Sequence, residues 1–264
     1  MKKMIIGVNW KIYMDSGDKI NNFIEEFKNN IKYFNTSLLE VYILPDFLSF
    51  KIVAEGLKDF PIMMGTQDIF WKDCGAYTGE VSPAFLASIG GNCVFIGHSE
   101  RKQYFGETNV TINKKVLACY RNKLVPLILV GETREQREQG LTLKTVKKQI
   151  QIALKGIPEE FMSKVVLIYE PVWAIGQKES APINLIRQCH EMVRNIITEL
   201  YNEHILRFTR ILYGGSVNYS NAQKIIEIPN VDGLAVTRGA LNPLDVINII
   251  RLVEREAINR TTKG

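Results

Sequence analysis

The chain has 264 residues, of which 46% are hydrophobic and 23% are charged, a balance that is typical of globular proteins and excludes a disordered or collagen-like chain. Its 33 basic and 28 acidic residues leave a net charge of +5. The basic residues form scattered pairs such as Lys2-Lys3 and Lys147-Lys148, whereas a nucleic-acid surface needs a basic stripe. We therefore expect no nucleic-acid partner.

The first apolar stretch, from Met4 to Val8, is too short for a signal peptide, and no later run approaches the ~18 apolar residues of a membrane span. We therefore expect no membrane partner. His, Cys, Asp and Glu do not show the spacing of metal ligands, so we also expect no bound metal. Four cysteines form no CxxC pair, which predicts buried free thiols in a reducing cytoplasm: Cys74, Cys93, Cys119 and Cys189.

Short apolar runs rich in β-branched residues recur along the chain, and each is followed by a polar or glycine-bearing cluster. Their continuous apolarity is typical of parallel strands that are buried on both faces. In chain order the predicted strands are 4–10, 41–45, 62–67, 93–98, 126–132, 164–171, 210–216 and 231–238.

Between most of these runs, apolar residues recur every three or four positions, which predicts helices with one buried face. The clearest are 20–34, with Ser16 or Asp15 as its N-cap, 146–154 and 186–200. Strand and helix alternate with no linker, so we expect residues 1–264 to form a single α/β domain, a (β/α)8 barrel. A doubly wound sheet is the alternative, but its GxGxxG motif is absent after the first strand.

Polar side chains gather at the predicted strand ends, which is where α/β barrels build their active sites. Asn9 and Lys11 close the first strand, His98 and Glu100 follow the fourth, and Glu170 closes the sixth. A lysine, a histidine and a glutamate at one mouth supply a fixed cation, a hydrogen-bonding electrophile and a base. The pattern therefore predicts acid–base chemistry.

Each of these residues also has an ordinary structural explanation when it is taken alone. Lys11 could be a surface charge, His98 a hydrogen-bonded structural histidine, and Glu170 a turn residue. Their joint placement at successive strand ends favours the functional interpretation. The other histidines, His190 and His204, fall in a helical stretch and at its exit, so we expect structural roles for them.

The last two predicted strands run into Gly214-Gly215-Ser216 and into Thr237-Arg238. Backbone N–H groups in such turns form a nest for a dianion, which is the usual phosphate position in this fold. A small phosphorylated substrate is therefore expected.

Six motifs occur in order along the chain: Asn9-Trp10-Lys11, Gly75-Ala76-Tyr77-Thr78-Gly79-Glu80, Ile96-Gly97-His98-Ser99-Glu100-Arg101, Tyr104-Phe105-Gly106-Glu107-Thr108, Tyr169-Glu170-Pro171-Val172-Trp173-Ala174-Ile175-Gly176 and Tyr213-Gly214-Gly215-Ser216-Val217. Through them the sequence resembles the triosephosphate isomerase family over essentially its whole length. The resemblance implies a (β/α)8 TIM barrel and a cofactor-free isomerisation of dihydroxyacetone phosphate and D-glyceraldehyde 3-phosphate through an enediolate.

The resemblance also implies residue roles, for which this family is itself the standard illustration. Glu170 would be the base that moves the proton between adjacent carbons, and His98 the neutral imidazole that polarises the carbonyl. Lys11 would balance the charge of the substrate, and Asn9 would help to polarise its oxygens. Glu100 would lie close behind Lys11 and His98.

A lid over residues 171–181 is a further implication of the resemblance, and its closure would exclude water that promotes loss of phosphate. Gly176 would give a backbone N–H to the phosphate, and Ser216 would hold the closed lid together with Gly215. Tyr213 would latch the lid through the backbone near Ala181.

The resemblance also implies a homodimer. The loop from Cys74 to Glu80 would insert into a second copy of the chain, with Thr78 reaching Asn9 of the partner subunit and Lys11 of the partner subunit. A monomer would then be poorly active.

The sequence departs from the family at the phosphate end of the site. Thr237 and Arg238 stand where the family usually has two glycines, so Arg238 would offer its guanidinium to phosphate or point into solvent. Backbone donors survive there only if the dihedrals suit a residue with a Cβ. Ala235 replaces a leucine that presses on the catalytic glutamate, which should weaken the apolar clamp that it shares with Ile175.

Three further positions differ, namely the far lid hinge at 177–180, Leu129 in place of a cysteine, and Asp68 in place of an asparagine. These departures leave two alternatives to an isomerase of triose phosphates. One is a paralogous isomerase acting on a four-carbon erythrulose phosphate, and the other is a barrel that serves only as a binding subunit.

Overall fold

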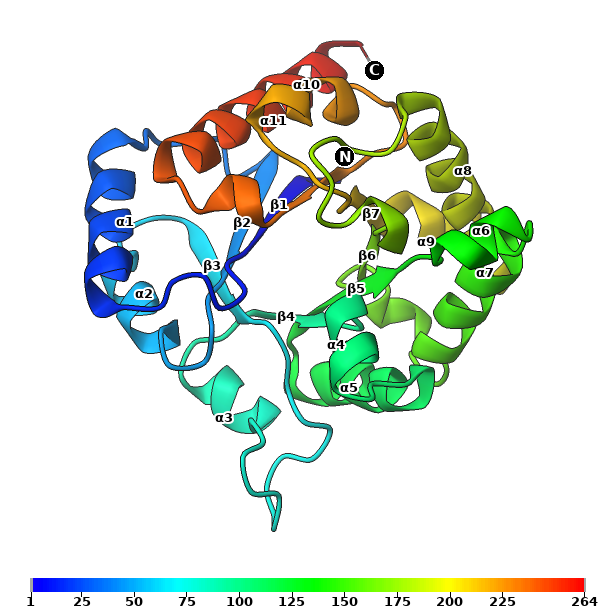
Figure 1. Cartoon of the computed structure of the whole chain (residues 1–264), viewed down its shortest axis with the longest axis horizontal. Coiled ribbons are helices and arrows are strands. Elements are labelled where there is room, and N and C mark those ends of the chain that lie inside the picture. The colour runs from blue at the N-terminus through cyan, green and yellow to red at the C-terminus, as the bar shows by residue number, and fades with distance from the viewer. Residues whose placement is uncertain (1, 264) are drawn as a thin grey trace.

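The structure is a computed structural model that describes residues 2–263. Within this range, parallel strands pair in sequence order and close into a barrel, as Figure 1 shows. The strands are β1 (Met4–Asn9), β2 (Leu39–Leu44), β3 (Ile62–Thr66), β4 (Cys93–Ile96), β5 (Val125–Val130), β6 (Val166–Tyr169), β7 (Arg210–Tyr213) and β8 (Gly233–Val236). The predicted (β/α)8 barrel is confirmed, and the doubly wound alternative is wrong.

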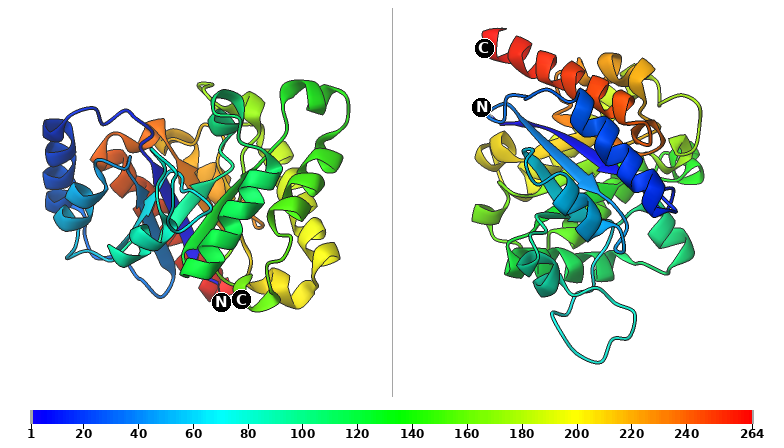
Figure 2. Two further views of the ribbon diagram at one scale, coloured as in Figure 1. Left: turned by 90° about the horizontal axis from the view of Figure 1, so that it is seen from below. Right: turned by 90° about the vertical axis from the view of Figure 1, so that its left-hand side faces the viewer.

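Helices surround the barrel between successive strands (Figures 1 and 2). They are α1 (Gly17–Asn30), α2 (Phe50–Gly56), α3 (Pro83–Ser88), α4 (Ser99–Tyr104), α5 (Asn109–Asn122), α6 (Arg134–Glu138), α7 (Thr142–Ala153), α8 (Ile183–Leu200), α9 (Glu203–Phe208), α10 (Tyr219–Ile226) and α11 (Pro243–Lys263), with 3-10 turns η1 (Glu159–Phe161), η2 (Val172–Ala174) and η3 (Arg238–Ala240).

The helix and strand ends differ slightly from the prediction. Ser16 is the cap of α1, because its Oγ accepts a hydrogen bond from the N–H of Lys19 at 3.3 Å. The helix then ends at Asn30, since Ile31 takes extended angles of φ −74° and ψ 135°, so Phe34 lies beyond it. Most strands also end before the polar cluster that follows them, because those residues leave the ladder to form loops, whereas β1 includes Asn9.

The core has an inner and an outer part, which is why the strands are apolar on both faces. Inside the barrel, side chains such as Phe95, Leu127 and Ile168 fill the interior. Outside it, residues such as Trp10 and Phe27 pack between strands and helices with no exposed area. Each such side chain contributes ~1.5–3 kcal/mol by leaving water.

The cysteine prediction holds for three positions and is wrong for one. Cys93, Cys119 and Cys189 are free and buried, whereas Cys74 is free and exposed because it lies in the segment that projects between β3 and α3 (Figure 1). Within residues 2–263, no helix is long and apolar enough to cross a bilayer, and no group of three or more His, Cys, Asp or Glu side chains is placed to hold a metal ion.

His190 has the structural role that was expected of it. The residue lies in α8 with no exposed area, and its Nδ1 is 3.1 Å from the carbonyl oxygen of Asn230. Burial lowers the pKa of His190 from 6.5 to about 4, because the charged ring would be desolvated.

This shift predicts a component of acid instability. As the pH falls from 6.5 to about 4, the unfolded chain takes up a proton at His190 that the folded chain does not, so the free energy of unfolding falls by about 3 kcal/mol. Urea unfolding across this range should show a shallower decline for the His190→Asn variant than for the unmodified chain. Parallel curves would contradict the assignment.

Candidate active site

A cavity of about 440 Å³ lies at the carboxyl ends of the strands. Predicted site residues from five strand ends and from the lid line it: Lys11, Glu100, Glu170, Gly176, Gly214, Ser216, Thr237 and Arg238. Asn9 and His98 do not line the cavity but contact Lys11 and Glu170, which do. Gly215 does not line it either, but it lies in the chain between two lining residues. Folding therefore brings together side chains that are far apart in the sequence.

Lys11 directly follows β1 and has a left-handed backbone with φ of 49°. Its N–H donates to Asn9 Oδ1 at 2.9 Å, and its carbonyl oxygen accepts from Gln67 Nε2 at 2.8 Å. A lysine in this conformation is strained by ~1–3 kcal/mol, and such strain is found where surroundings hold a functional residue. The Nζ of Lys11 then lies 2.5 Å from Glu100 Oε1.

His98 caps the short helix α4, and this fixes the orientation of its ring. Its Nδ1 accepts a hydrogen bond from the N–H of Glu100 at 3.2 Å. Because an amide can only donate, Nδ1 carries no proton, and Nε2 is the nitrogen that carries it. Nε2 lies 3.6 Å from Glu170 Oε1, so a donor and a carboxylate face one another.

Glu170 follows β6 and is only 7% exposed. Its N–H donates to the carbonyl oxygen of Val130 at 2.8 Å, which continues the pairing of β5 with β6. A Cβ on Gly131 would lie 2.0 Å from the carbonyl oxygen of Glu170. Glycine at 131 is therefore what allows the two chain segments to approach and places the carboxylate.

The predicted contacts of the lid with β7 are confirmed. The N–H of Ala181 donates to Tyr213 Oη at 3.0 Å, and Ser216 Oγ donates to the carbonyl oxygen of Ala174 at 2.7 Å. Ser216, like Lys11, has a left-handed backbone, with φ of 49°. Two of the three non-glycine residues with such a backbone in the described chain therefore lie in the site, and the third, Lys123, is the C-cap of α5.

Gly214 and Gly215 make room for these contacts. A Cβ on Gly215 would lie 2.3 Å from Tyr213 Oη, so a larger residue would displace the hydroxyl that holds the lid. A Cβ on Gly214 would lie 2.8 Å from Ile168 in the barrel interior. Both glycines thus allow close packing at the end of β7.

The side chain of Arg238 is exposed, as one of the two expectations had it, and it also bonds to the lid segment. It lines the cavity, and its Nη2 donates to the carbonyl oxygen of Gln177 in the lid at 3.0 Å. The backbone accepts a side chain here because Thr237 has φ of −122° and ψ of −85°, so glycine is not required.

Glu132 is a functional position whose role sequence reasoning missed. It is fully buried and accepts hydrogen bonds from Tyr169 Oη, Trp173 Nε1 and Arg137 Nη1 at 3.0–3.1 Å. Burial strongly raises the pKa of Tyr169, so its hydroxyl remains a donor. Glu132 thereby holds the start of the lid. Its position at the end of a predicted strand was the available signal.

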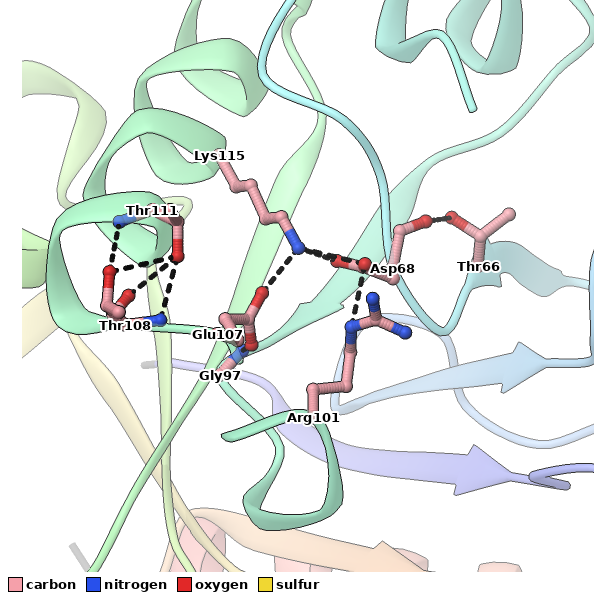
Figure 3. Close-up of polar contacts among 8 residues, drawn as sticks. All are labelled: Thr66, Asp68, Gly97, Arg101, Glu107, Thr108, Thr111 and Lys115. Atoms are coloured by element: carbon pink, nitrogen blue, oxygen red, sulfur yellow. Dashed lines mark hydrogen bonds and ion pairs between the residues drawn. The ribbon is translucent and has the colours of Figure 1, made fainter. Parts of the chain in front are cut away.

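A second group of charges lies behind the turn that follows β4 (Figure 3). Lys115 Nζ donates to both oxygens of Asp68 at 2.6 and 2.8 Å and also to Glu107. Arg101 Nε lies 2.8 Å from Asp68, and Glu107 accepts from the N–H of Gly97 at 3.1 Å. Burial raises the pKa of Asp68 to about 6, against the opposing effect of the two cations. The group ties the end of β4 to the start of the projecting segment.

Comparison with known proteins agrees with this architecture. The family model described as triosephosphate isomerase matches residues 4–253. The chain belongs to the triosephosphate isomerase family. It is 40% identical to the triosephosphate isomerase of Dictyoglomus turgidum over 95% of this chain and 100% of that protein. It is 40% identical to the triosephosphate isomerase of Caldanaerobacter subterraneus over 95% of this chain and 99% of that protein. It is 37% identical to the triosephosphate isomerase of Citrifermentans bemidjiense over 96% of this chain and 100% of that protein.

Ala235, where the resemblance leads us to expect a leucine, forms part of the wall of the site. Ala235 lines the cavity and packs with the barrel interior. A Cβ on Gly214 would lie 3.5 Å from the Ala235 Cβ and 3.6 Å from the Glu170 Cβ, so these positions are neighbours. The wall beside Glu170 is therefore smaller than a leucine would make it.

Proposed function

We propose that the chain interconverts dihydroxyacetone phosphate and D-glyceraldehyde 3-phosphate by proton transfer through an enediolate. The observation that carries this proposal is the convergence of Lys11, His98 and Glu170 on one cavity whose far side has Gly-rich turns. A base, a neutral donor and a cation around a phosphate-sized anion site are what this reaction requires.

In the proposed reaction, the Glu170 carboxylate removes a proton from C1 of the ketose, and the electron pair forms the C1–C2 double bond. The carbonyl oxygen takes up the negative charge next to His98 Nε2–H, which stabilises it. The proton of the C1 hydroxyl passes to the oxygen on C2, and Glu170 returns its proton to C2. Lys11 and Asn9 stabilise the charge on the oxygens, and Glu100 orients Lys11.

The phosphate is proposed to bind at the opposite side of the cavity. The N–H groups of the turns after β7 and β8 and of the lid supply the donors, and the Arg238 guanidinium adds a charge. The proposed phosphate-binding residues are Gly176, Gly214, Gly215, Ser216, Thr237 and Arg238. Binding of the dianion beside Gln177 and Arg238 would favour the closed lid and exclude water from the enediolate.

Steady-state kinetics with two substrates tests the proposal. We expect kcat/KM for D-glyceraldehyde 3-phosphate to exceed that for erythrulose phosphate by orders of magnitude, each tenfold step being ~1.4 kcal/mol of transition-state stabilisation. A preference for erythrulose phosphate would overturn the triose assignment, and the absence of turnover with both would favour the binding-subunit alternative.

Ala235→Leu is expected to improve triose turnover by roughly threefold to tenfold. The larger side chain would restore the apolar contact beside Glu170 and remove space that the triose does not fill, worth ~1 kcal/mol for the added methylenes. The measurement is kcat/KM for both substrates, with Leu212→Met in the barrel interior as a control for general core changes. A clear fall in triose turnover would contradict the clamp hypothesis.

The active form is proposed to be a homodimer built through the loop from Cys74 to Glu80. Two features support this: the segment projects away from the barrel (Figures 1 and 2), and large apolar side chains near the mouth are exposed. Ile12 is 84% exposed and Leu48 is 92% exposed. Apolar surface of this kind is typical of a site that a partner covers.

Sedimentation of the unmodified chain and of a loop variant tests the dimer. We expect sedimentation of the 30.1-kDa chain to give twice this mass. The variant Thr78→Arg should sediment as a monomer with kcat on the order of a hundredfold lower, because Lys11 and its neighbours lose their support. Thr262→Arg, at an exposed position on α11, is the control. Full activity in a monomeric variant would overturn the requirement for a partner.

A cytoplasmic location is also proposed, supported by buried free thiols that a reducing compartment preserves. Cell fractionation with antibodies against the chain should find it with cytoplasmic markers. Recovery with secreted or membrane fractions would overturn the assignment.

A further inference from the structure

A second cavity, of about 380 Å³, lies away from the active site. Six residues line it: Lys2, Lys3, Ser163, Arg207, Phe208 and Arg210. Four of these are basic, and none of the six is acidic. The proposed reaction uses none of them.

The position of this cavity separates it from the catalytic end of the barrel. Lys2 and Lys3 precede β1, Arg210 is the first residue of β7, and Ser163 precedes β6. These are the amino ends of parallel strands, whereas the active site lies at the carboxyl ends. Figure 2 shows the start of the chain at one end of the barrel, beside the C-terminal helix α11. The barrel interior therefore lies between the two cavities.

Two of the four cations already hydrogen-bond to carboxylates. Lys2 Nζ donates to Asp232 Oδ2 at 2.9 Å, and Arg210 Nη1 donates to Glu40 Oε2 at 3.1 Å. Lys3 also faces Glu40, but at 3.8 Å, which is an ion pair without a hydrogen bond. Arg207 is exposed, and within residues 2–263 its side chain makes no hydrogen bond or ion pair. Three of the four cations thus share two carboxylates, and Arg207 has neither.

The surroundings of Lys2 disfavour its charged form, chiefly through burial. Burial lowers the pKa of Lys2, and the nearby guanidinium groups of Arg194 and Arg210 lower it further, against the effect of Asp232. Arg210 itself is 8% exposed, and its buried Nε has no hydrogen-bond partner in the described part of the chain. An anion in the cavity would relieve this repulsion, since opposite charge favours the protonated amine.

Phe208 adds an apolar surface to the basic cavity. It is 46% exposed, and one side of its ring packs edge-on against His204, with 5.1 Å between ring centroids. The remaining ring surface is available to a ligand with a flat or apolar body. Ser163 Oγ makes only a 3.3 Å bond to the carbonyl oxygen of Glu160, so it can reorient toward an anion.

From this arrangement, we propose that the cavity at the amino end of the barrel binds an organic anion that carries two or more phosphate groups. The phosphates lie between Lys3 and Arg207, whose side chains donate no hydrogen bond to a carboxylate within residues 2–263. The organic part rests on Phe208. Charge-assisted bonds from a guanidinium and an ammonium suit phosphate oxygens, and the forked guanidinium fits two of them at once.

Titration calorimetry with ATP in the absence of magnesium tests the proposal. We expect one saturable site per chain, weakened by added salt because the cations are partly exposed. Lys3→Gln and Arg207→Gln should each weaken binding about tenfold. Isomerisation kinetics of these variants should remain unchanged, which distinguishes this site from the proposed active site.

Matched variants exclude the simpler explanations. Arg134→Gln makes the same change of charge at an exposed position on α6 and should leave the affinity for ATP unaltered. Phe208→Ala should weaken ATP severalfold but leave tripolyphosphate binding unchanged. Loss of binding in Arg238→Gln, with full binding in Arg207→Gln, would place the ATP in the catalytic cavity and overturn the proposal. Equal loss in Arg134→Gln would also overturn it, as would unchanged ATP binding in Phe208→Ala.

Discussion

Replacing Glu170 with glutamine should lower kcat for triose isomerisation by about 10²- to 10⁴-fold, the range that a positioned general base contributes. Glutamine has nearly the same shape and can keep the contact with His98 Nε2, now 3.6 Å from Glu170 Oε1. It cannot accept a proton from carbon, so only the proton transfer is removed. Initial rates in both directions would measure the loss.

The same variant should keep its fold and its affinity for phosphate. Glu170 contacts neither the turns after β7 and β8 through hydrogen bonds nor the lid latch at Tyr213, so those features remain. Thermal unfolding and binding of inorganic phosphate are therefore the controls. Activity close to that of the unmodified chain would reject the proton-transfer role. Loss of both activity and phosphate binding would indicate a structural defect.

The second large effect is expected from Gly131→Ala, a position that carries no reactive group. The new Cβ would lie 2.0 Å from the carbonyl oxygen of Glu170, a distance that forces the backbone apart. A displacement of this size at the carboxylate proposed as the base should cost on the order of a hundredfold in kcat. Overpacking should also lower the free energy of unfolding by ~1–3 kcal/mol.

A matched glycine serves as the control for this variant. A Cβ on Gly17, at the start of α1, meets no atom within 4 Å, so Gly17→Ala should leave kcat unchanged and stability equal or slightly higher. The two variants add the same methyl group and differ only in what it contacts. If Gly131→Ala kept full activity, the close approach of β5 to Glu170 would not be what positions the base.

Much of the fold was predictable because it follows from local patterns. Continuous apolar runs mark strands that are buried on both faces, and Ile20 and Phe27 repeat at the spacing of a helix with one buried face. The convergence of the candidate reactive groups was predictable for a related reason, since the carboxyl ends of parallel strands meet at one end of a barrel. Lys11, His98 and Glu170 could thus be placed at one mouth without coordinates.

Other features depend on which distant segments meet once the barrel closes. Gln67 holds the backbone of Lys11 across 56 positions, and Arg238 bonds to Gln177 across 61. No periodicity encodes such pairs, because they arise from loops that are brought together only by strand pairing. The exposure of Cys74 has the same origin, since a cysteine is exposed or buried according to where its loop projects.

The apolar spacing of the chain therefore accounts for its fold class, and the motifs that it shares with the triosephosphate isomerase family account for its family and its candidate reactive groups. Each of these features lies in short stretches of sequence. The bond partners of those groups, the close approach at Gly131 and the basic cavity around Arg207 come from contacts between segments that are remote in the chain. Such contacts depend on the closed barrel as a whole, in which a shift of one strand changes what every neighbouring loop can reach.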